Sequence, residues 1–99
     1  KDGNQGPEKA RRAARRANAQ ARQRLAPLRK IVKQAEKEMA ALQAEHQRIA
    51  QALADPGLYQ EAPEKVATLN QQRSQTEKAI AAAETAWMAA EEELEAAKV

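Results

Sequence analysis

Two stretches of the chain carry a heptad pattern of inward-facing positions, and this pattern restricts the fold more than any other feature. The spacing alternates between three and four residues, as at the a and d positions of a coiled-coil helix. The first stripe comprises Leu25, Leu28, Val32, Ala35, Met39, Leu42, His46, Ile49 and Leu53. The second comprises Val66, Leu69, Arg73, Thr76, Ile80, Ala83, Trp87, Ala90, Leu94 and Ala97. The pattern predicts helices over about residues 27–54 and 63–98.

The stripes are separated by ADPGLYQEAP, residues 54–63, in which two prolines and a glycine predict a turn over residues 55–62. Two helices of similar length joined by a short loop should fold back on each other. The predicted fold class is therefore all-α, a two-helix antiparallel coiled-coil hairpin. If facing residue numbers add to 122, large side chains meet small ones, and Ala35 faces Trp87. A slip of one heptad, which places Trp87 on Leu28, is a bulkier alternative.

The composition agrees with a thin helical core. Ala, Glu, Gln, Lys, Arg and Leu dominate, with one Trp, one Tyr and no Phe. The chain has no cysteine, which excludes disulfides and thiolate metal sites and fits a reducing compartment. No apolar run approaches the ~20 residues that cross a bilayer. We expect a cytoplasmic protein with no membrane partner, and a monomer, although weak self-association through the seam is an alternative.

Charge is divided unevenly along the chain. Residues 9–33 contain ten lysines and arginines and no acidic residue. Residues 1–33 have eleven basic and two acidic side chains, a net charge of +9, whereas residues 34–99 have six and twelve, a net of −6. Such asymmetry indicates that the basic end contacts a polyanion.

The basic part precedes the hairpin. Residues 1–7 contain two glycines, a proline and no apolar anchor, which predicts a disordered linker. Residues 8–26 form a helix-prone basic arm whose one bulky apolar residue is Leu25. Pro27 predicts a break or kink, with the proline in the first turn of the next helix. In the register given above, everything before about Arg22 overhangs the hairpin.

Contact with nucleic-acid phosphates is the predicted role of the basic arm and of the start of the hairpin. No aromatic side chains are interleaved to stack on bases, and the arm offers alanine rather than the bulky apolar face that membrane binding needs. Phosphate contacts hold a nucleic acid without reading its sequence. A solvated helical linker remains the structural alternative. The candidate nucleic-acid-binding residues are Arg11, Arg12, Arg15, Arg16, Arg22, Arg24, Arg29, Lys30 and Lys33.

Other conspicuous residues have structural explanations. His46 is expected to form a polar layer opposite Thr76 rather than a metal site, since no second His or Cys is present. Trp87 is expected in the core rather than as a stacking platform, and Arg73 should extend its stem along the seam with its head in solvent. Two further expectations are a cap or contact at the tip, from Leu58 and Tyr59, and an ion pair between Arg29 and Glu91. No arrangement supports catalysis or a phosphate-binding glycine loop, so this chain is not expected to be an enzyme or to hold a cofactor.

Several segments resemble the C-terminal domain of the ABC-F ATPases, as found in Uup-like and YheS-like bacterial proteins. They are RQRLAPLRKIVKQAEKEMAAL, LADPGLYQ, PEKVATLNQQ and ETAWMAAEEELE, within residues 22–97. The resemblance is most specific at the turn signature LADPGLY and at Trp87, and LAPLRK looks most like the YheS-type branch. One departure is the alanine content of the second stripe, at Ala83, Ala90 and Ala97, where longer side chains are common. The hairpin should be correspondingly less stable.

The resemblance implies a parent protein with two upstream ATP-binding cassettes that use ATP and magnesium. Such parents are cytosolic and act on the ribosome in translation, and in Uup-like members this domain is associated with DNA binding. The role would fall on Arg22, Arg24, Arg29, Lys30 and Lys33, whereas Arg11 to Arg16 are assigned on charge alone. The predicted function is a non-catalytic module that binds DNA or ribosomal RNA. The alternative is a spacer or protein-interaction coiled coil that docks on the parent ATPase or another protein.

Overall fold

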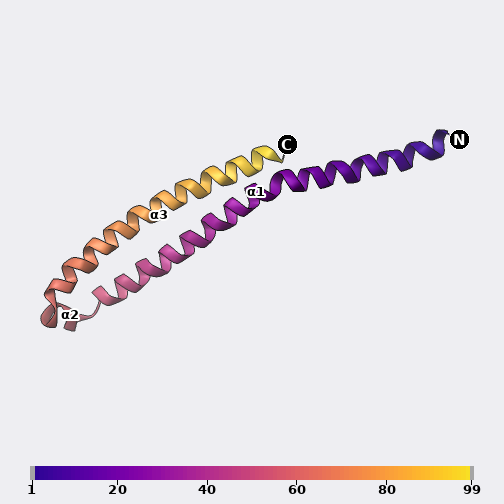
Figure 1. The fold of residues 1–99 in the computed structure, drawn as a ribbon. Helices are drawn as coiled ribbons and strands as arrows, with labels where there is room; N and C mark the ends of the chain where they lie inside the picture. Colours follow the sequence, from indigo (N-terminus) through magenta and orange to yellow (C-terminus); the bar gives the residue numbers. More distant parts are fainter. Residues whose placement is uncertain (1, 99) are drawn as a thin grey trace.

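The molecule is a long rod in which one helix folds back along half of another (Figure 1). A computed structural model describes the backbone of residues 2–98 and the side chains of residues 6–98. Its principal extents are 89 × 18 × 13 Å. Three helices make up the described chain, and it contains no strand: α1 (Asp2–Leu53), α2 (Pro56–Glu61) and α3 (Pro63–Ala97). No helix among these residues is both long enough and apolar enough to cross a bilayer.

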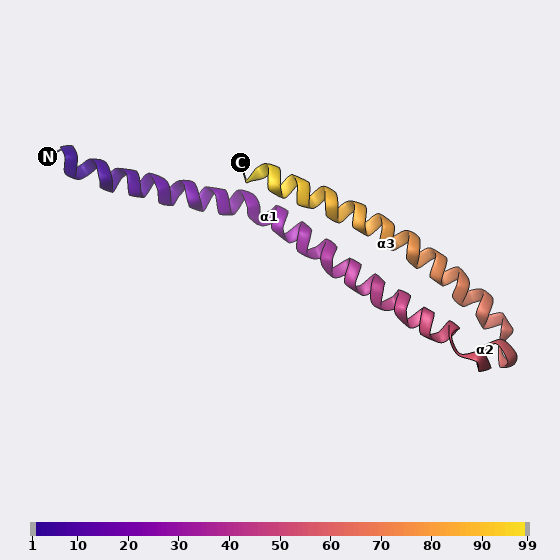
Figure 2. The same cartoon turned by 180° about the vertical axis from the view of Figure 1, so that it is seen from behind.

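Helix α3 lies beside the second half of α1 in a hairpin-like arrangement, as both views show (Figures 1 and 2). Side-chain contacts fix the relative position of the two helices. As the residue numbers rise along α1, those of the partners in α3 fall, and the pairs are Arg24 with Ala97, Glu36 with Trp87, and His46 with Glu77. The two numbers of each pair add to between 121 and 123, which agrees with the predicted sum of 122.

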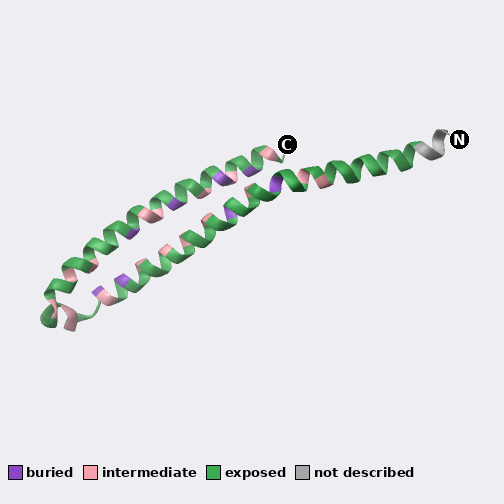
Figure 3. Ribbon diagram, viewed as in Figure 1, coloured by how far each residue is buried: buried purple, intermediate pink, exposed green. Residues whose placement is uncertain are grey.

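The core is a narrow seam between α1 and α3, seen as the inward-facing buried positions in Figure 3. All nine predicted positions of the first stripe are buried or half-buried. In the second stripe, Arg73 is exposed, as expected for a snorkelling arginine, and the other nine are buried or half-buried. Both heptad stripes are thus confirmed. One end of the seam is a cluster of Leu25, Val32, Ala90 and Leu94, against which Leu28, Trp87 and Ala97 pack.

Pro27 does not break α1, so of the predicted break or kink the break is wrong, and the proline does not lie in the first turn of a new helix. The helix continues through the proline and changes direction near the place where α3 ends (Figures 1 and 2). A proline inside a helix removes one hydrogen bond and costs about 3 kcal/mol. Leu25 and Leu28 lie on either side of Pro27 and both pack into the cluster described above. Their burial against α3 holds both sides of the proline in one helix.

Helix α1 also begins earlier than expected. It starts at Asp2, whereas the sequence predicts a disordered linker over residues 1–7, of which Lys1 lies outside the described residues. Extending an existing helix adds one hydrogen bond for each residue that is ordered, whereas starting one is unfavourable. The helix-prone arm that follows Gly6 and Pro7 therefore supplies a helix onto which the earlier residues add.

The predicted turn contains a short helix of its own. Leu53 ends α1, and Asp55 caps α2 by accepting a hydrogen bond from the Gly57 backbone N–H at 3.0 Å. Pro56 occupies the first position of α2, where its missing N–H costs nothing. The Tyr59 hydroxyl donates to the Leu53 carbonyl oxygen at 2.9 Å and so satisfies one of the free carbonyls at the end of α1.

Candidate nucleic-acid interface

The basic arm is the part of α1 that extends beyond α3. Because α3 ends at Ala97, level with Arg24, no second helix of the described residues covers the arm. Every residue from 6 to 18 is exposed, in contrast to the alternating burial of the hairpin (Figure 3). The arm therefore presents its side chains to solvent on all sides.

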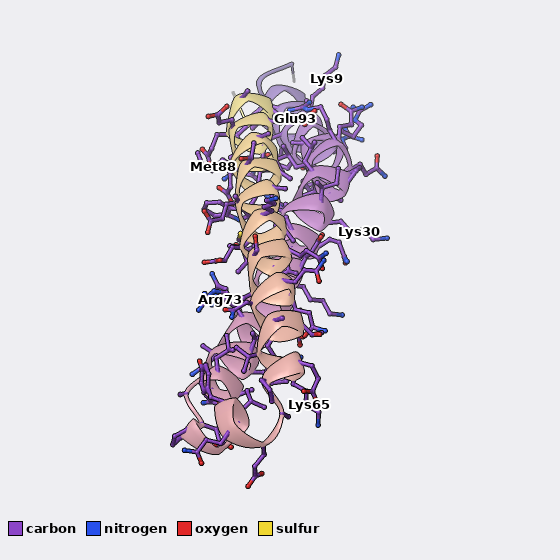
Figure 4. All side chains as sticks on the ribbon, turned by 90° about the vertical axis from the view of Figure 1, so that its left-hand side faces the viewer. Lys9, Lys30, Lys65, Arg73, Met88 and Glu93 are labelled. Carbon is purple, nitrogen blue, oxygen red and sulfur yellow. The ribbon has the colours of Figure 1, made fainter. Side chains whose placement is uncertain are left out.

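The continuity of α1 places most of the candidate residues on one face. An α-helix turns by about 100° per residue, so eight of the nine candidates fall within an arc of about 140°. They are Arg11, Arg12, Arg15, Arg16, Arg22, Arg29, Lys30 and Lys33. We call this surface the basic face. The same geometry puts Leu28 and Val32 more than about 120° from the middle of that arc. Figure 4 shows Lys30 pointing away from α3, with Lys9 on the overhanging part of α1.

Two shallow depressions lie along the basic face. The first is lined by Arg12, Arg15, Arg16 and Ala19. The second is lined by Ala26, Arg29, Lys30, Lys33, Gln34 and Lys37. Each depression is lined by at least three basic side chains, so an anion that approaches it meets several donors at once. Guanidinium and ammonium groups arranged in this way suit phosphate oxygens.

Among the described side chains, no ion pair neutralises a residue of the basic face. Over the described side chains, the ion pairs join Glu45 with Arg48, Glu95 with Lys98, and His46 with Glu77, the last at 3.6 Å and charged only if the histidine is protonated. The predicted pair between Arg29 and Glu91 is not among them. Like charges four residues apart destabilise a helix. Arg11 with Arg15, and Arg12 with Arg16, have this spacing, and a polyanion would relieve their repulsion.

Arg24 differs from the other candidates because it faces the hairpin. Its Nη2 donates a hydrogen bond to the Ala97 carbonyl oxygen at 3.2 Å. That carbonyl is one of the last in α3, where unpaired acceptors and the helix dipole favour a cation. The structure thus gives Arg24 a role in joining the end of α3 to α1, and it lies outside the basic face.

Lys37 belongs to the basic face but was not among the sequence candidates. It lines the second depression, one helical turn after Lys33. Lys37 lies after Glu36, the first acidic residue that follows the basic run, so an argument based on that run does not include it. The spacing Arg29, Lys33, Lys37, four residues at each step, is the signal that could have identified it.

The remaining sequence candidates take structural positions. Trp87 is half-buried, packs against the Leu25 cluster and donates its indole N–H to Glu36, which supports the core interpretation. His46 is half-buried in the seam, and its Nε2 is enclosed without a hydrogen-bond partner. Thr76 is buried as expected, but its hydroxyl donates to the Gln72 carbonyl oxygen at 2.8 Å rather than to the histidine.

Comparison with known protein families identifies the family of the chain. The family described as the ABC transporter C-terminal domain matches residues 27–96, which is most of the chain and includes both helices of the hairpin. The chain belongs to this family. No curated protein and no solved structure matches it. The match begins at Pro27 and leaves the first depression outside the family region, while the second lies almost wholly within it.

Proposed function

We propose that this chain is a non-catalytic nucleic-acid-binding module that holds DNA or ribosomal RNA by its phosphates. The observation that carries the proposal is the basic face, nine exposed lysines and arginines, Lys37 included, on one side of a continuous helix. Among the described side chains, none of the nine forms an ion pair. The hairpin, which we propose is an antiparallel coiled coil, anchors this face. The paired helices make the second half of α1 a stiff support, and the arm extends from it.

Binding of this kind follows from charge neutralisation. Each lysine or arginine that meets a phosphate releases a condensed counterion, so affinity falls as salt rises. Such contacts position the protein on the nucleic acid but carry no base information. Across the described residues, the exposed large apolar side chains are Ile31, Tyr59 and Met88, and none of them belongs to the basic face. Stacking on bases is therefore not part of the proposed mechanism.

A salt series with duplex DNA and with structured RNA tests this proposal. About six phosphate contacts predict a log–log slope of affinity against salt near −5 on DNA. Sequence should matter little, because phosphates are the same in every sequence. A slope near zero, or no binding at low salt, would contradict the proposal.

We also propose that the module is the C-terminal part of a cytosolic ABC-F ATPase that acts on the ribosome. Membership of the ABC transporter C-terminal domain family supports an ATP-binding-cassette parent. The cassettes, with their ATP and magnesium, would lie in the preceding part of that parent. Crosslinking of the parent to ribosomes from cells, followed by mapping of the contacted RNA, tests this assignment. Contacts confined to other proteins would contradict it.

The competing function, a spacer or protein-docking hairpin, would use the tip. In the structure the tip residues make contacts within the hairpin itself. The Tyr59 hydroxyl donates a hydrogen bond to the Leu53 carbonyl oxygen, and Leu58 is half-buried. Altering the tip, with Leu58→Ser, and altering the arm, with Arg15→Gln and Arg16→Gln, separates the two functions. The nucleic-acid proposal expects loss of binding with the arm variant alone, and loss with the tip variant alone would favour docking.

A further inference from the structure

We infer that the ligand of the basic face is a double helix, held at two separate places along α1. The inference rests on the proposed function and adds the kind of nucleic acid and the geometry of its contact. It comes from the two depressions, which occupy the same side of α1 and are separated along the helix axis.

The two depressions lie on the same side of α1, and we call this relationship their phase. On a helix that turns about 100° per residue, the residues that line both fall within the same arc of about 140°. Their centres are some sixteen residues apart, or about 24 Å at a rise of about 1.5 Å per residue. Between Ala19 and Ala26 the face carries a single basic side chain, Arg22. The charge is therefore concentrated at two points rather than spread evenly.

This spacing suits the two backbones of a duplex. The major groove of B-DNA is about 12 Å wide between the phosphate walls, and one helical turn spans about 34 Å. Points about 24 Å apart along the helix fall between these lengths, so a continuous α-helix that crosses a groove can touch one backbone near each depression. Neighbouring phosphates of one strand lie much closer together than the two depressions do.

The phase of the depressions is held by the packing around Pro27. Leu25 and Leu28 anchor the helix on both sides of the proline in one cluster with α3. The arm is thereby fixed in rotation relative to the hairpin. A duplex has a persistence length of about 50 nm and meets only the side of the rod that faces it. A single strand can wrap and reach charges on any side, so it would be indifferent to the phase.

Insertions into the exposed arm separate these cases without changing charge. Two alanines added after Gln20 rotate the first depression by about 200° and lengthen the spacing by about 3 Å. Four alanines rotate it by only about 40° but lengthen the spacing by about 6 Å. The two-alanine insertion thus changes mainly the side of α1 on which the first depression lies, whereas the four-alanine insertion changes mainly the distance between the two depressions. Circular dichroism of both full-length variants checks that the helix and the hairpin are retained.

Binding is measured with duplex DNA, duplex RNA of the same sequence, and single-stranded oligo-dT. For a duplex, we expect the two-alanine insertion to lower affinity about tenfold or more and to reduce the salt slope by about 2.7, the loss of three phosphate contacts. The four-alanine insertion should bind within about threefold of the unaltered chain, and oligo-dT should bind both variants equally. Whichever duplex shows this pattern is the ligand class.

Two results would overturn the inference. One is equal binding of a duplex by both insertions and by the unaltered chain, and the other is binding of oligo-dT as tight as that of either duplex. In both, the proposed function survives, because the unaltered chain still binds nucleic acid in a salt-dependent way. Failure of the unaltered chain to bind any of the three probes would instead reject the proposed function itself.

Discussion

The indole Nε1 of Trp87 donates a hydrogen bond to the Glu36 carboxylate at 3.3 Å, and so joins the middle of α1 to α3. The ring packs at the same time against the cluster of Leu25, Val32, Ala90 and Leu94. One side chain thus combines apolar burial with a polar contact across the hairpin. Because the arm is positioned by this end of the seam, the contact bears on the orientation of the basic face.

Trp87→Ala should lower the free energy of unfolding by about 2 kcal/mol, less than for a fully buried tryptophan because Trp87 is half-buried. Trp87→Phe keeps most of the apolar contact and should cost about 1 kcal/mol. Thermal unfolding followed by circular dichroism measures both. Met88→Ala is the control, since Met88 is 54% exposed, and it should change stability by no more than about 0.5 kcal/mol. Equal effects at positions 87 and 88 would contradict the observed packing.

Two isoleucines on α1 provide a matched test of the seam. Ile49 is fully buried, at 0% exposure, and Ile31 is 53% exposed. Ile49→Ala should cost about 3 kcal/mol because it leaves a cavity between the helices, whereas Ile31→Ala should cost less than about 0.5 kcal/mol. Urea unfolding of the two variants measures the difference. A larger loss from position 31 would mean that α3 packs on another face of α1.

The Tyr59 hydroxyl connects the tip to the end of α1. Tyr59→Phe removes the hydrogen bond to the Leu53 carbonyl and leaves that acceptor to water, so it should cost about 1 kcal/mol. Hydrogen exchange should also be faster in the last turn of α1. Asp55→Ala, which removes the cap of α2, should have a comparable effect of about 1 kcal/mol. Unchanged exchange in Tyr59→Phe would show that the bond does not hold the turn.

Acid should remove one small surface contribution. The side-chain hydrogen bond from Arg48, helped by its positive charge, holds the pKa of Glu45 below its ordinary value of 4.5. A carboxylate whose pKa is lower in the folded chain stabilises the fold above its unfolded pKa, and this contribution is lost as the pH falls through the folded value. At neutral pH, Glu45→Gln should therefore melt slightly below the unaltered chain. The gap should close as the pH falls below 4.5. A gap that is the same at every pH would contradict the pairing.

The sequence alone predicts most of the hairpin because a heptad seam depends on spacing that can be counted. The positions from Leu25 to Leu53 all fall where the pattern puts them. Of the two outcomes predicted at Pro27, the break is wrong because burial against distant residues opposes the local effect of proline, whereas a kink agrees with the change of direction in α1 (Figures 1 and 2). Leu25 and Leu28 pack against residues more than sixty positions away, and this packing outweighs the local cost.

The candidate interface was only partly predictable. The charge run identifies the arginines and lysines, but their arrangement on one face depends on whether α1 is continuous, which the sequence did not reveal. Arg24 could not be separated from its neighbours by charge, since its contact with Ala97 depends on where α3 ends. The bond between Glu36 and Trp87 depends on rotamers, for which spacing gives no signal.

The central claim is that position on the basic face, rather than net charge, determines binding. Two triple variants with the same change in charge test it most directly: Arg12, Arg15 and Arg16 replaced by Gln, and Lys65, Arg73 and Lys78 replaced by Gln. All six residues are exposed. The measurement is the salt slope of affinity for duplex DNA. We predict that the first variant loses about 2.7 from the slope, as expected for three phosphates, and that the second keeps the slope of the unaltered chain. Equal losses in the two variants would contradict the claim.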